Sequence, residues 1–393
     1  MDWPRVTVFQ VPVRAGSSVG LTGSVMRVLS GITSYEHSIA VNIGYESCQV
    51  TFAATLADAL FWLNQLRAGM IATGPDAETI WEGYLASVSV QVGALTQSLS
   101  LDGMANRLRV RYVNTNGVPG FTSTASDTAS IARYGTRDMV LSVGTTNATV
   151  AGQARTTALA QYKNPRASGG STISTGESGS ESTITLTFAG WGSTLGWVLT
   201  SRTDTSTEQT TTQITDLLAG TGVGIGTVNA FIASTVIITA SGVNDTRFIA
   251  PDTTYRQKID DLVSRGTSGG QRLVWGMYAG RKVFVQQWAG ATPSTINYWV
   301  NQQARAIYGG VLDGRTQATA PPIATAVLPW NVRPNAMAAL VELYDPGPVS
   351  TAQDATNRFF VERVTCRIDA SGYSVTLEPG EQTGLDAILA RIA

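Results

Sequence analysis

The stretch SVSVQV at residues 87–92 alternates a small or polar side chain with a valine. Because successive side chains of a strand point to opposite faces of a sheet, this period of two predicts a half-buried strand. A turn at residues 93–94 and a return strand follow, and Leu95, Leu99 and Leu101 share one face of that strand. The pattern predicts an antiparallel hairpin in a small β-sandwich or barrel.

The next strand, RLRVRY at residues 107–112, is predicted to turn its apolar side chains inward and Arg107, Arg109 and Arg111 outward. We call these three residues the arginine ladder. Like charges on one strand face repel one another unless a negative group lies opposite them. The ladder is therefore a solvated face or a set of ion pairs within the chain, or else a subunit interface or channel lining.

One helix is predicted on the flank of this first β segment. Thr55 and Asp58 have the spacing of a capping box, and leucines at helical spacing continue to Met70. Gly69 is a plausible terminator.

Composition restricts the class of protein. The chain has 393 residues and 41.5 kDa, and 43% of its residues are hydrophobic, which excludes bulk disorder. Charged residues make up only 14%, against about 25% in ordinary soluble proteins. The net charge is −1, so no whole-chain basic field exists to hold nucleic acid. This composition suggests a β-rich chain whose surface is committed to protein contacts.

Residues for catalysis or metal binding are scarce. The single histidine, His37, has no nucleophile motif nearby, and the two cysteines, Cys48 and Cys366, are far apart in sequence and predicted to stay reduced and buried. The glycines of residues 220–226 fit neither nucleotide-binding fingerprint.

The carboxylates also show no catalytic pair. Asp260 and Asp261 are adjacent on a predicted helix and should point in different directions, and Asp138 is isolated in the sequence. We therefore expect no catalytic residue, no metal site, no cofactor and no enzymatic activity.

No targeting signal or membrane helix is predicted. Residues 1–5 lack the basic and apolar regions of a signal peptide. The longest uncharged stretch, residues 217–244, contains too many Gly, Thr, Ser and Asn residues for a membrane span. We expect no stable membrane insertion.

Composition breaks divide the chain. Residues 114–130 are polar, residues 167–181 are almost wholly Ser, Gly and Thr, and residues 316–322 end in two prolines. Between the breaks the pattern predicts a strand over residues 131–143, helices over 149–162 and 251–265, a short helix ending at Gly220, and a hairpin turning at residues 279–280. After the last break the chain is again β, with a hairpin turning at residues 369–372 and a short helix at residues 385–392. The fold class is mainly β with α+β insertions.

Five short motifs carry a family resemblance. They are TIWEGY at 79–84, the run at 101–112, YGTR at 134–137, FFVERV at 359–364 and LDAILAR at 385–391. In this order they resemble hub and tail-tip proteins of tailed bacteriophages.

The resemblance implies a structural virion protein without a catalytic residue. It implies two tube-like β-barrels, at residues 1–113 and 321–393, with a small α+β insertion at 114–170 and a second insertion at 171–320. A homotrimer would present six barrels and cap the hexameric tail tube at the tail tip or baseplate. Implied partners are the tail tube or distal tail protein, the tape-measure protein, fibre or spike proteins, and genomic DNA in transit. The protein would be located in the virion, after assembly in the host cytoplasm.

Two other functions stay open. One is a hexameric distal tail or tube-like protein, which differs from a hub in stoichiometry. The other is a receptor- or carbohydrate-binding tail protein, in which exposed tryptophans and paired carboxylates would line a groove. At Trp62, Trp81, Trp191 and Trp275 a place in the core is favoured over an interface.

Overall fold

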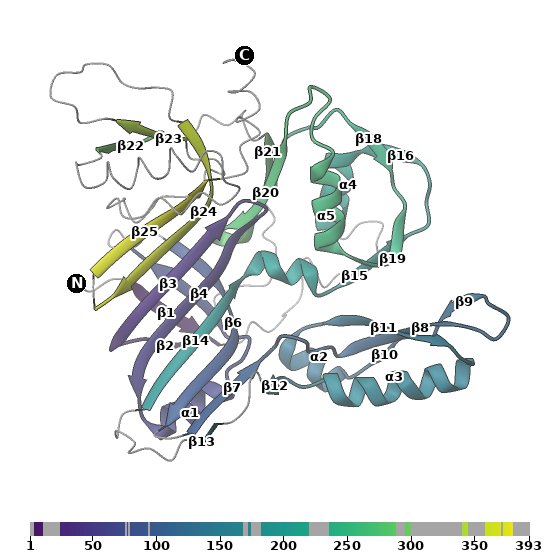
Figure 1. The fold of residues 1–393 in the computed structure, drawn as a ribbon, viewed down its shortest axis with the longest axis horizontal. Coiled ribbons are helices and arrows are strands. Elements are labelled where there is room, and N and C mark those ends of the chain that lie inside the picture. Colours follow the sequence, from purple (N-terminus) through teal and green to yellow (C-terminus); the bar gives the residue numbers. More distant parts are fainter. Residues whose placement is uncertain are drawn as a thin grey trace.

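The fold is mainly β, as predicted. The computed structural model describes residues 4–10, 24–74, 77, 79–92, 95–167, 172–173, 182–219, 236–287, 295–299, 340–344, 358–370 and 372–379. Figure 1 shows a twisted sheet on one side and two lobes projecting from it on the other.

We call the sheet the scaffold sheet. Its strands run antiparallel to their neighbours in the order β2–β1–β5–β6–β14–β4–β3–β24–β25. Their bounds are β1 Arg5–Phe9, β2 Val25–Val28, β3 Ile32–Ala40, β4 Ile43–Ala54, β5 Gly69–Thr73, β6 Thr79–Val92, β14 Ser182–Gly190, β24 Arg358–Asp369 and β25 Gly372–Pro379.

The predicted alternation at residues 87–92 lies in β6, whose second half also pairs with β7 (Leu95–Ser100). Two short strands, β12 (Arg166–Ala167) and β13 (Thr172–Ile173), pair with the far side of β7. The hairpin predicted from the valine pattern is confirmed.

β14 joins the scaffold sheet from the middle of the chain. It lies between β4 and β6 and alternates buried and half-buried residues along its length. The sequence places residues 182–190 in the unit 171–320, whereas their pairing is with residues 47–54 and 83–91. Because both neighbouring strands come from a distant part of the chain, the local sequence of β14 does not indicate which sheet it joins.

The two ends of the chain share the scaffold sheet. β24 pairs with β3 from Arg363↔Ala40 to Ile368↔Tyr35, and β25 returns along β24 as predicted. Arg363 donates from Nε and Nη2 to the Glu46 carboxylate, both at 2.9 Å. The described strands of residues 321–393 thus extend the sheet that the first segment begins.

Helix α1 (Leu56–Leu63) begins at the predicted capping box, in which the Thr55 side chain accepts from Asp58 N and Asp58 accepts from Thr55 N. The helix ends earlier than predicted, with Asn64 as its C-cap, and Met70 lies in β5. Pairing of β5 with β1 and β6 outweighs the helical spacing of the later leucines.

The first lobe, residues 106–162, has a sheet of its own. β8 (Arg107–Val113) pairs with β9 (Pro119–Phe121), β10 (Ala125–Ser126) and, in parallel, β11 (Asp138–Thr145). The sequence groups β8 with the first barrel, but it lies outside the scaffold sheet. The helix predicted at residues 149–162 is α3 (Ala148–Tyr162). The strand predicted over residues 131–143 is confirmed only in its second half, which lies in β11, because residues 131–134 belong to helix α2 (Thr128–Tyr134).

The second lobe consists of the described residues of 197–265. A 3-10 turn, η1 (Trp191–Gly196), leads from β14 to β15 (Leu199–Arg202), which pairs with β19 (Ile249–Thr254). β16 (Thr207–Gln209) pairs with β18 (Asn244–Thr246). The two predicted helices are α4 (Thr210–Ala219) and α5 (Tyr255–Ser264).

A hairpin links the second lobe to the scaffold. β20 (Leu273–Tyr278) and β21 (Lys282–Gln287) turn at η3 (Ala279–Arg281), as predicted, and β20 touches the start of β4. β17 (Val236–Ile238) pairs with β21. β22 (Thr295–Trp299) pairs with β23 (Leu340–Tyr344), which pairs with β24. The predicted helix at 385–392 lies outside the described residues.

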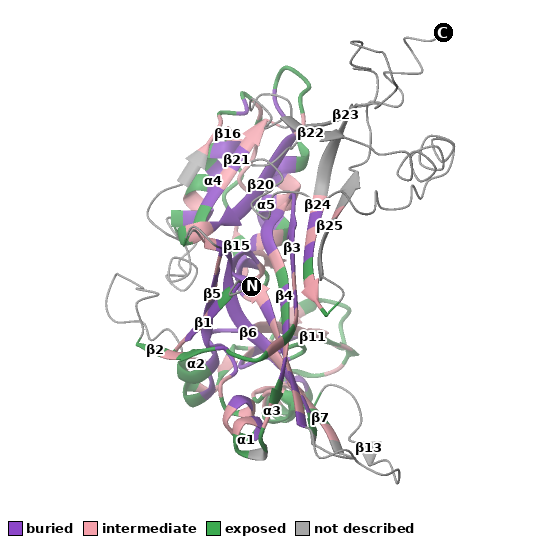
Figure 2. Cartoon of the chain, turned by 90° about the vertical axis from the view of Figure 1, so that its left-hand side faces the viewer, coloured by how far each residue is buried: buried purple, intermediate pink, exposed green. Residues whose placement is uncertain are grey.

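The core runs through the scaffold sheet and the base of the second lobe. Figure 2 shows the buried residues along β5, β6 and β20. Trp62, Trp81, Trp191 and Trp275 all lie in this core, as predicted. Within the described residues, no helix is long and apolar enough to cross a membrane.

Candidate functional site

Strand β8 positions the arginine ladder on the face that looks toward the second lobe. Its other face is apolar: Leu108 and Val110 are fully buried and pack against Ala151 and Ala158 of α3. The predicted division of the strand into an apolar and an arginine face is confirmed.

The first arginine of the ladder forms an ion pair within the chain. Parallel pairing sets Asp138 opposite Arg107, whose Nη2 donates to Asp138 Oδ2 at 2.6 Å while its Nε donates to Oδ1. The backbone N–H of Leu199 donates to the same Oδ2 at 2.8 Å. Hydrogen bonding to Asp138 raises the pKa of Arg107. One carboxylate therefore ties the two lobes together.

The other two arginines differ from the first and from each other. Arg111 Nη1 lies 3.5 Å from Asp252 Oδ2 of the second lobe, and both side chains are about half exposed, at 51% and 42%. The Arg109 guanidinium lies over the Phe121 ring, 4.8 Å from its centroid. Arg109 Nε is buried, and it has no hydrogen-bond partner among the described residues.

Arg107 and Arg109 line a pocket of about 380 Å³ between the two lobes. The first lobe contributes Thr124 and Asp138, and the second contributes residues 199–201 and Pro251. The pocket combines guanidinium groups, hydroxyl groups and apolar surface, which is the mixture found in sites that bind a polar group in a fixed orientation.

The structure thus brings all three ladder residues to one face and gives each a different role. The interpretation as intrachain ion pairs holds for Arg107 and Arg111. Sequence reasoning missed Asp138, which it treated as an isolated carboxylate. Its only signal would have been the parallel register of β8 and β11, which connects residues 31 positions apart.

Two further arginines were missed as structural residues. Arg137, in the YGTR motif, is 7% exposed; its guanidinium lies 3.7 Å from the centroid of Trp197 and Nη1 donates to Leu101 O at 3.1 Å. Burial lowers its pKa, and burial also lowers the pKa of Arg67 to about 10. They lie where the first lobe meets the scaffold sheet, so we assign them to the joint between these parts.

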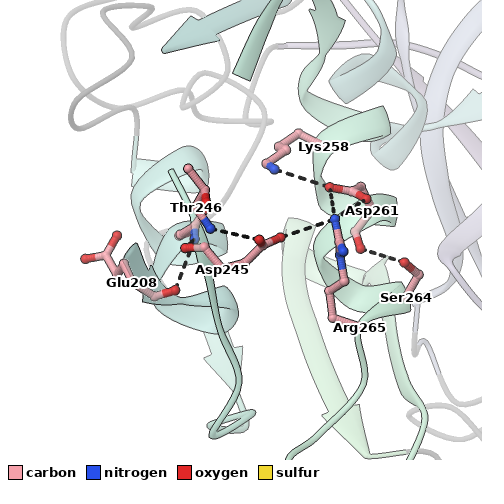
Figure 3. A network of polar contacts seen from close by, with 8 residues as sticks. Glu208, Asp245, Thr246, Lys258, Asp261, Ser264 and Arg265 are labelled. Atoms are coloured by element: carbon pink, nitrogen blue, oxygen red, sulfur yellow. Dashed lines mark hydrogen bonds and ion pairs between the residues drawn. The ribbon is translucent and has the colours of Figure 1, made fainter. Parts of the chain in front are cut away.

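The adjacent carboxylates Asp260 and Asp261 point in different directions, as predicted. Asp260 accepts from Trp275 Nε1 at 2.7 Å, and burial raises its pKa. Asp261 pairs with Lys258 at 3.2 Å and with Arg265 at 3.1 Å. Figure 3 shows Arg265 reaching onward to Asp245, which joins α5 to β18. The Asp261 and Arg265 contacts join elements within the second lobe, and the Asp260 contact joins α5 to β20.

His37, Cys48 and Cys366 form one row across three neighbouring strands. His37 lies opposite Cys48 in β4 and opposite Cys366 in β24. All three are buried, and both cysteines are reduced, as predicted. Burial lowers the pKa of His37 to about 3. In the part of the chain that the structure describes, no group of three or more His, Cys, Asp or Glu side chains is arranged to hold a metal ion.

Comparisons with known proteins give structural neighbours only. The sequence matches no protein-family model and no curated protein. The fold is similar to the 43 kDa tail protein of prophage MuSo2 from Shewanella oneidensis, with a TM-score of 0.44 and 9% identity over 95% of this chain and 96% of that one. It is similar to the tail protein from Neisseria meningitidis MC58, with a TM-score of 0.44 and 10% identity over 96% of each chain.

A third neighbour is the E. coli c3393 protein, described as a component of the type VI secretion system with structural similarity to T4 bacteriophage tail proteins gp27 and gp5. The TM-score is 0.33 and the identity 8%, over 89% of this chain and 74% of that one. At these scores and identities, we base the function on the residues of this chain.

Proposed function

We propose that this chain is a structural protein of a phage tail tip or baseplate, and that it works as a homotrimeric hub without enzymatic activity. In this role three copies cap the hexameric tail tube, contact the tape-measure protein, anchor fibre or spike proteins and gate the exit of DNA. The motifs quoted above at residues 79–84, 134–137 and 359–364 suggest this class of protein.

One structural observation carries the proposal. The first and last parts of the described chain share a single scaffold sheet, joined by β3–β24 pairing and by the Arg363–Glu46 ion pair, while the two lobes project to one side. This arrangement gives a ring subunit two kinds of surface, a sheet and two projecting lobes, for contacts with neighbouring copies and with other partners.

Composition supports the same role. Interfaces are enriched in arginine and aromatic residues and depleted in lysine, and this chain has only three lysines, Lys163, Lys258 and Lys282. The burial of Trp62, Trp81, Trp191 and Trp275 removes the feature that would have favoured a carbohydrate-binding groove at those positions.

The mass of the purified assembly, measured by native mass spectrometry and checked by negative-stain electron microscopy, tests the proposal. We expect three copies of the 41.5 kDa chain and images with three-fold symmetry. Six copies would favour the distal tail or tube-like alternative. A chain that stays monomeric at micromolar concentration would contradict the hub.

A further inference from the structure

Arg109 differs from Arg107 and Arg111 in having no acidic partner among the residues that the structure describes. Arg107 is held by Asp138 and Arg111 by Asp252, whereas Arg109 forms no ion pair with any described residue. Its guanidinium is nevertheless held in place, because it lies over the Phe121 ring. A positioned guanidinium without a carboxylate is a binding group that lacks its ligand.

The pocket around Arg109 has the charge of a site for a single anion. Its lining contains two arginines and one carboxylate, Asp138, and that carboxylate already accepts from Arg107 and from the Leu199 N–H. One positive charge is left, on Arg109. A nucleic-acid backbone presents many phosphates and binds where several cations are free, so this lining favours a lone monoanion over a polyanion.

The size of the pocket agrees with a small acidic group. Its volume of about 380 Å³ is at the lower end of the range of roughly 300–1,000 Å³ seen for ligand pockets. Thr124 and Ser201, which carry hydroxyl groups, and the apolar residues Leu199 and Pro251 line the pocket together with Arg109. A short side chain with an apolar stem and a carboxylate head suits this lining.

We propose that the pocket receives one carboxylate, from an Asp or Glu side chain of a neighbouring protein chain, with Arg109 as its ion-pair partner. The planar guanidinium presents parallel N–H donors that match the two oxygens of a carboxylate. This proposal rests on the proposed function, because a tail subunit has neighbouring chains that can supply such a side chain.

The test uses a small probe on the full chain. N-acetyl-L-glutamate N-methylamide carries one carboxylate on a protein-like stem, and N-acetyl-L-glutamine N-methylamide is its neutral isostere. Binding is measured by microscale thermophoresis on labelled protein, diluted until its mass shows monomers, so that no neighbouring copy fills the pocket. We expect the glutamate probe to bind and the glutamine probe to bind at least about tenfold more weakly.

Two variants on the same strand localise the effect. Arg109→Gln should weaken binding of the glutamate probe about tenfold to a hundredfold, and Arg109→Lys should restore only part of it because lysine lacks the planar fork. Arg111→Gln is the matched control, since Arg111 does not line the pocket, and it should bind as wild type does. Circular dichroism and the melting temperature confirm that each variant is folded.

Three results would overturn the proposal: equal binding of the neutral probe, equal losses in Arg109→Gln and Arg111→Gln, or tighter binding of inorganic phosphate, duplex DNA or free succinate than of the glutamate probe. The last would assign the pocket to phosphate or to a small metabolite. A trimer whose dissociated chains ignore the probe refutes this inference and leaves the hub intact. A monomeric protein that binds the probe refutes the hub but keeps the carboxylate pocket.

Discussion

At the scale of single residues, the polar side chains of the candidate site contact partners that are distant in sequence. The alternation of residues 107–112 predicts correctly which side chains leave the core, but it says nothing about what they meet. Asp138 reaches Arg107 only because β11 pairs with β8 in parallel, and Asp252 reaches Arg111 from another lobe. The arginines of the candidate site could therefore be predicted from the sequence. Their carboxylate partners and the pocket could not.

Replacing Asp138 by Asn should destabilise the protein by about 1–3 kcal/mol. The Asp138 side chain is 6% exposed, and the change removes the charged acceptor of the Arg107 guanidinium and of the Leu199 N–H. Urea unfolding measures the loss, and hydrogen exchange should show it at β8, β11 and β15. Asp252→Asn is the control, and it should cost well under 1 kcal/mol because the pair with Arg111 is exposed. Equal effects of the two changes would contradict the assigned roles.

His37 should make the protein less stable in acid. Burial lowers its pKa to about 3, whereas an unfolded histidine titrates near 6.5, so between these values the unfolded chain binds a proton that the folded chain does not. The free energy of unfolding therefore falls as the pH falls through this window, by about 2 kcal/mol at pH 5 from this group alone.

The variant His37→Phe, which keeps a ring in the buried site, isolates this effect. Urea midpoints of wild type and variant, compared at pH 7.5 and pH 5, should converge or cross as the wild type loses its share. Parallel pH profiles for the two proteins would show that His37 does not carry the effect.

At the scale of elements, local rules succeed where the contacts are local. The capping box at Thr55 and Asp58, the α5 region and the hairpins at residues 279–281 and 369–372 all follow from short-range signals. The predictions are wrong where contacts with distant segments determine whether a segment forms a helix or a strand. Met70 belongs to a strand because β1 and β6 flank it. Residues 131–134, predicted as the start of a strand over residues 131–143, belong to helix α2, which is capped by Asp127.

The close approach of β14 to β4 gives a sharp test. A Cβ at Gly190 would lie 1.7 Å from the carbonyl oxygen of Tyr45, and backbone cannot move aside without breaking the sheet. Gly190→Ala should therefore destabilise the protein by about 3 kcal/mol or more, or prevent soluble expression. The control is Gly152→Ala in α3, where a Cβ meets nothing within 4 Å. That change should stabilise by about 0.5–1 kcal/mol, through helix propensity. Melting temperatures that move in the same direction in both variants would refute this reading.

At the scale of the whole molecule, composition predicts the fold class but not which strands belong to which sheet. Low charge and alternating valines indicate a β-rich protein, which the structure confirms. The composition breaks, however, do not coincide with the ends of the sheets. β8 leaves the first segment for its own lobe, β14 enters the scaffold sheet from the middle of the chain, and β24 joins β3. Composition is a local property of the sequence, whereas membership of a sheet depends on pairing between distant strands.

Reversal of charge at Arg109 tests the ladder in the assembly. Arg109→Glu should lower the fraction of chains in the ring or impede DNA passage, because it repels the acidic side chain that we propose for the pocket, and the monomer should stay folded. Mass photometry over a dilution series gives the assembled fraction, and Arg133→Glu, an exposed arginine outside the pocket, is the control. If assembly and DNA passage are unchanged, the arginine ladder forms only intrachain ion pairs and solvated surface.

The pairing of β3 with β24 also fixes the order of events during synthesis. Glu46 and Arg363 are 317 residues apart, so the edge of β3 has no strand beside it until nearly the whole of this sequence has left the ribosome. Contacts of such long range slow folding. An unfinished chain would present an open strand edge, a surface that invites aggregation. A nascent chain of this protein is therefore expected to need protection, by a chaperone or by rapid translation, until its last described hairpin is in place.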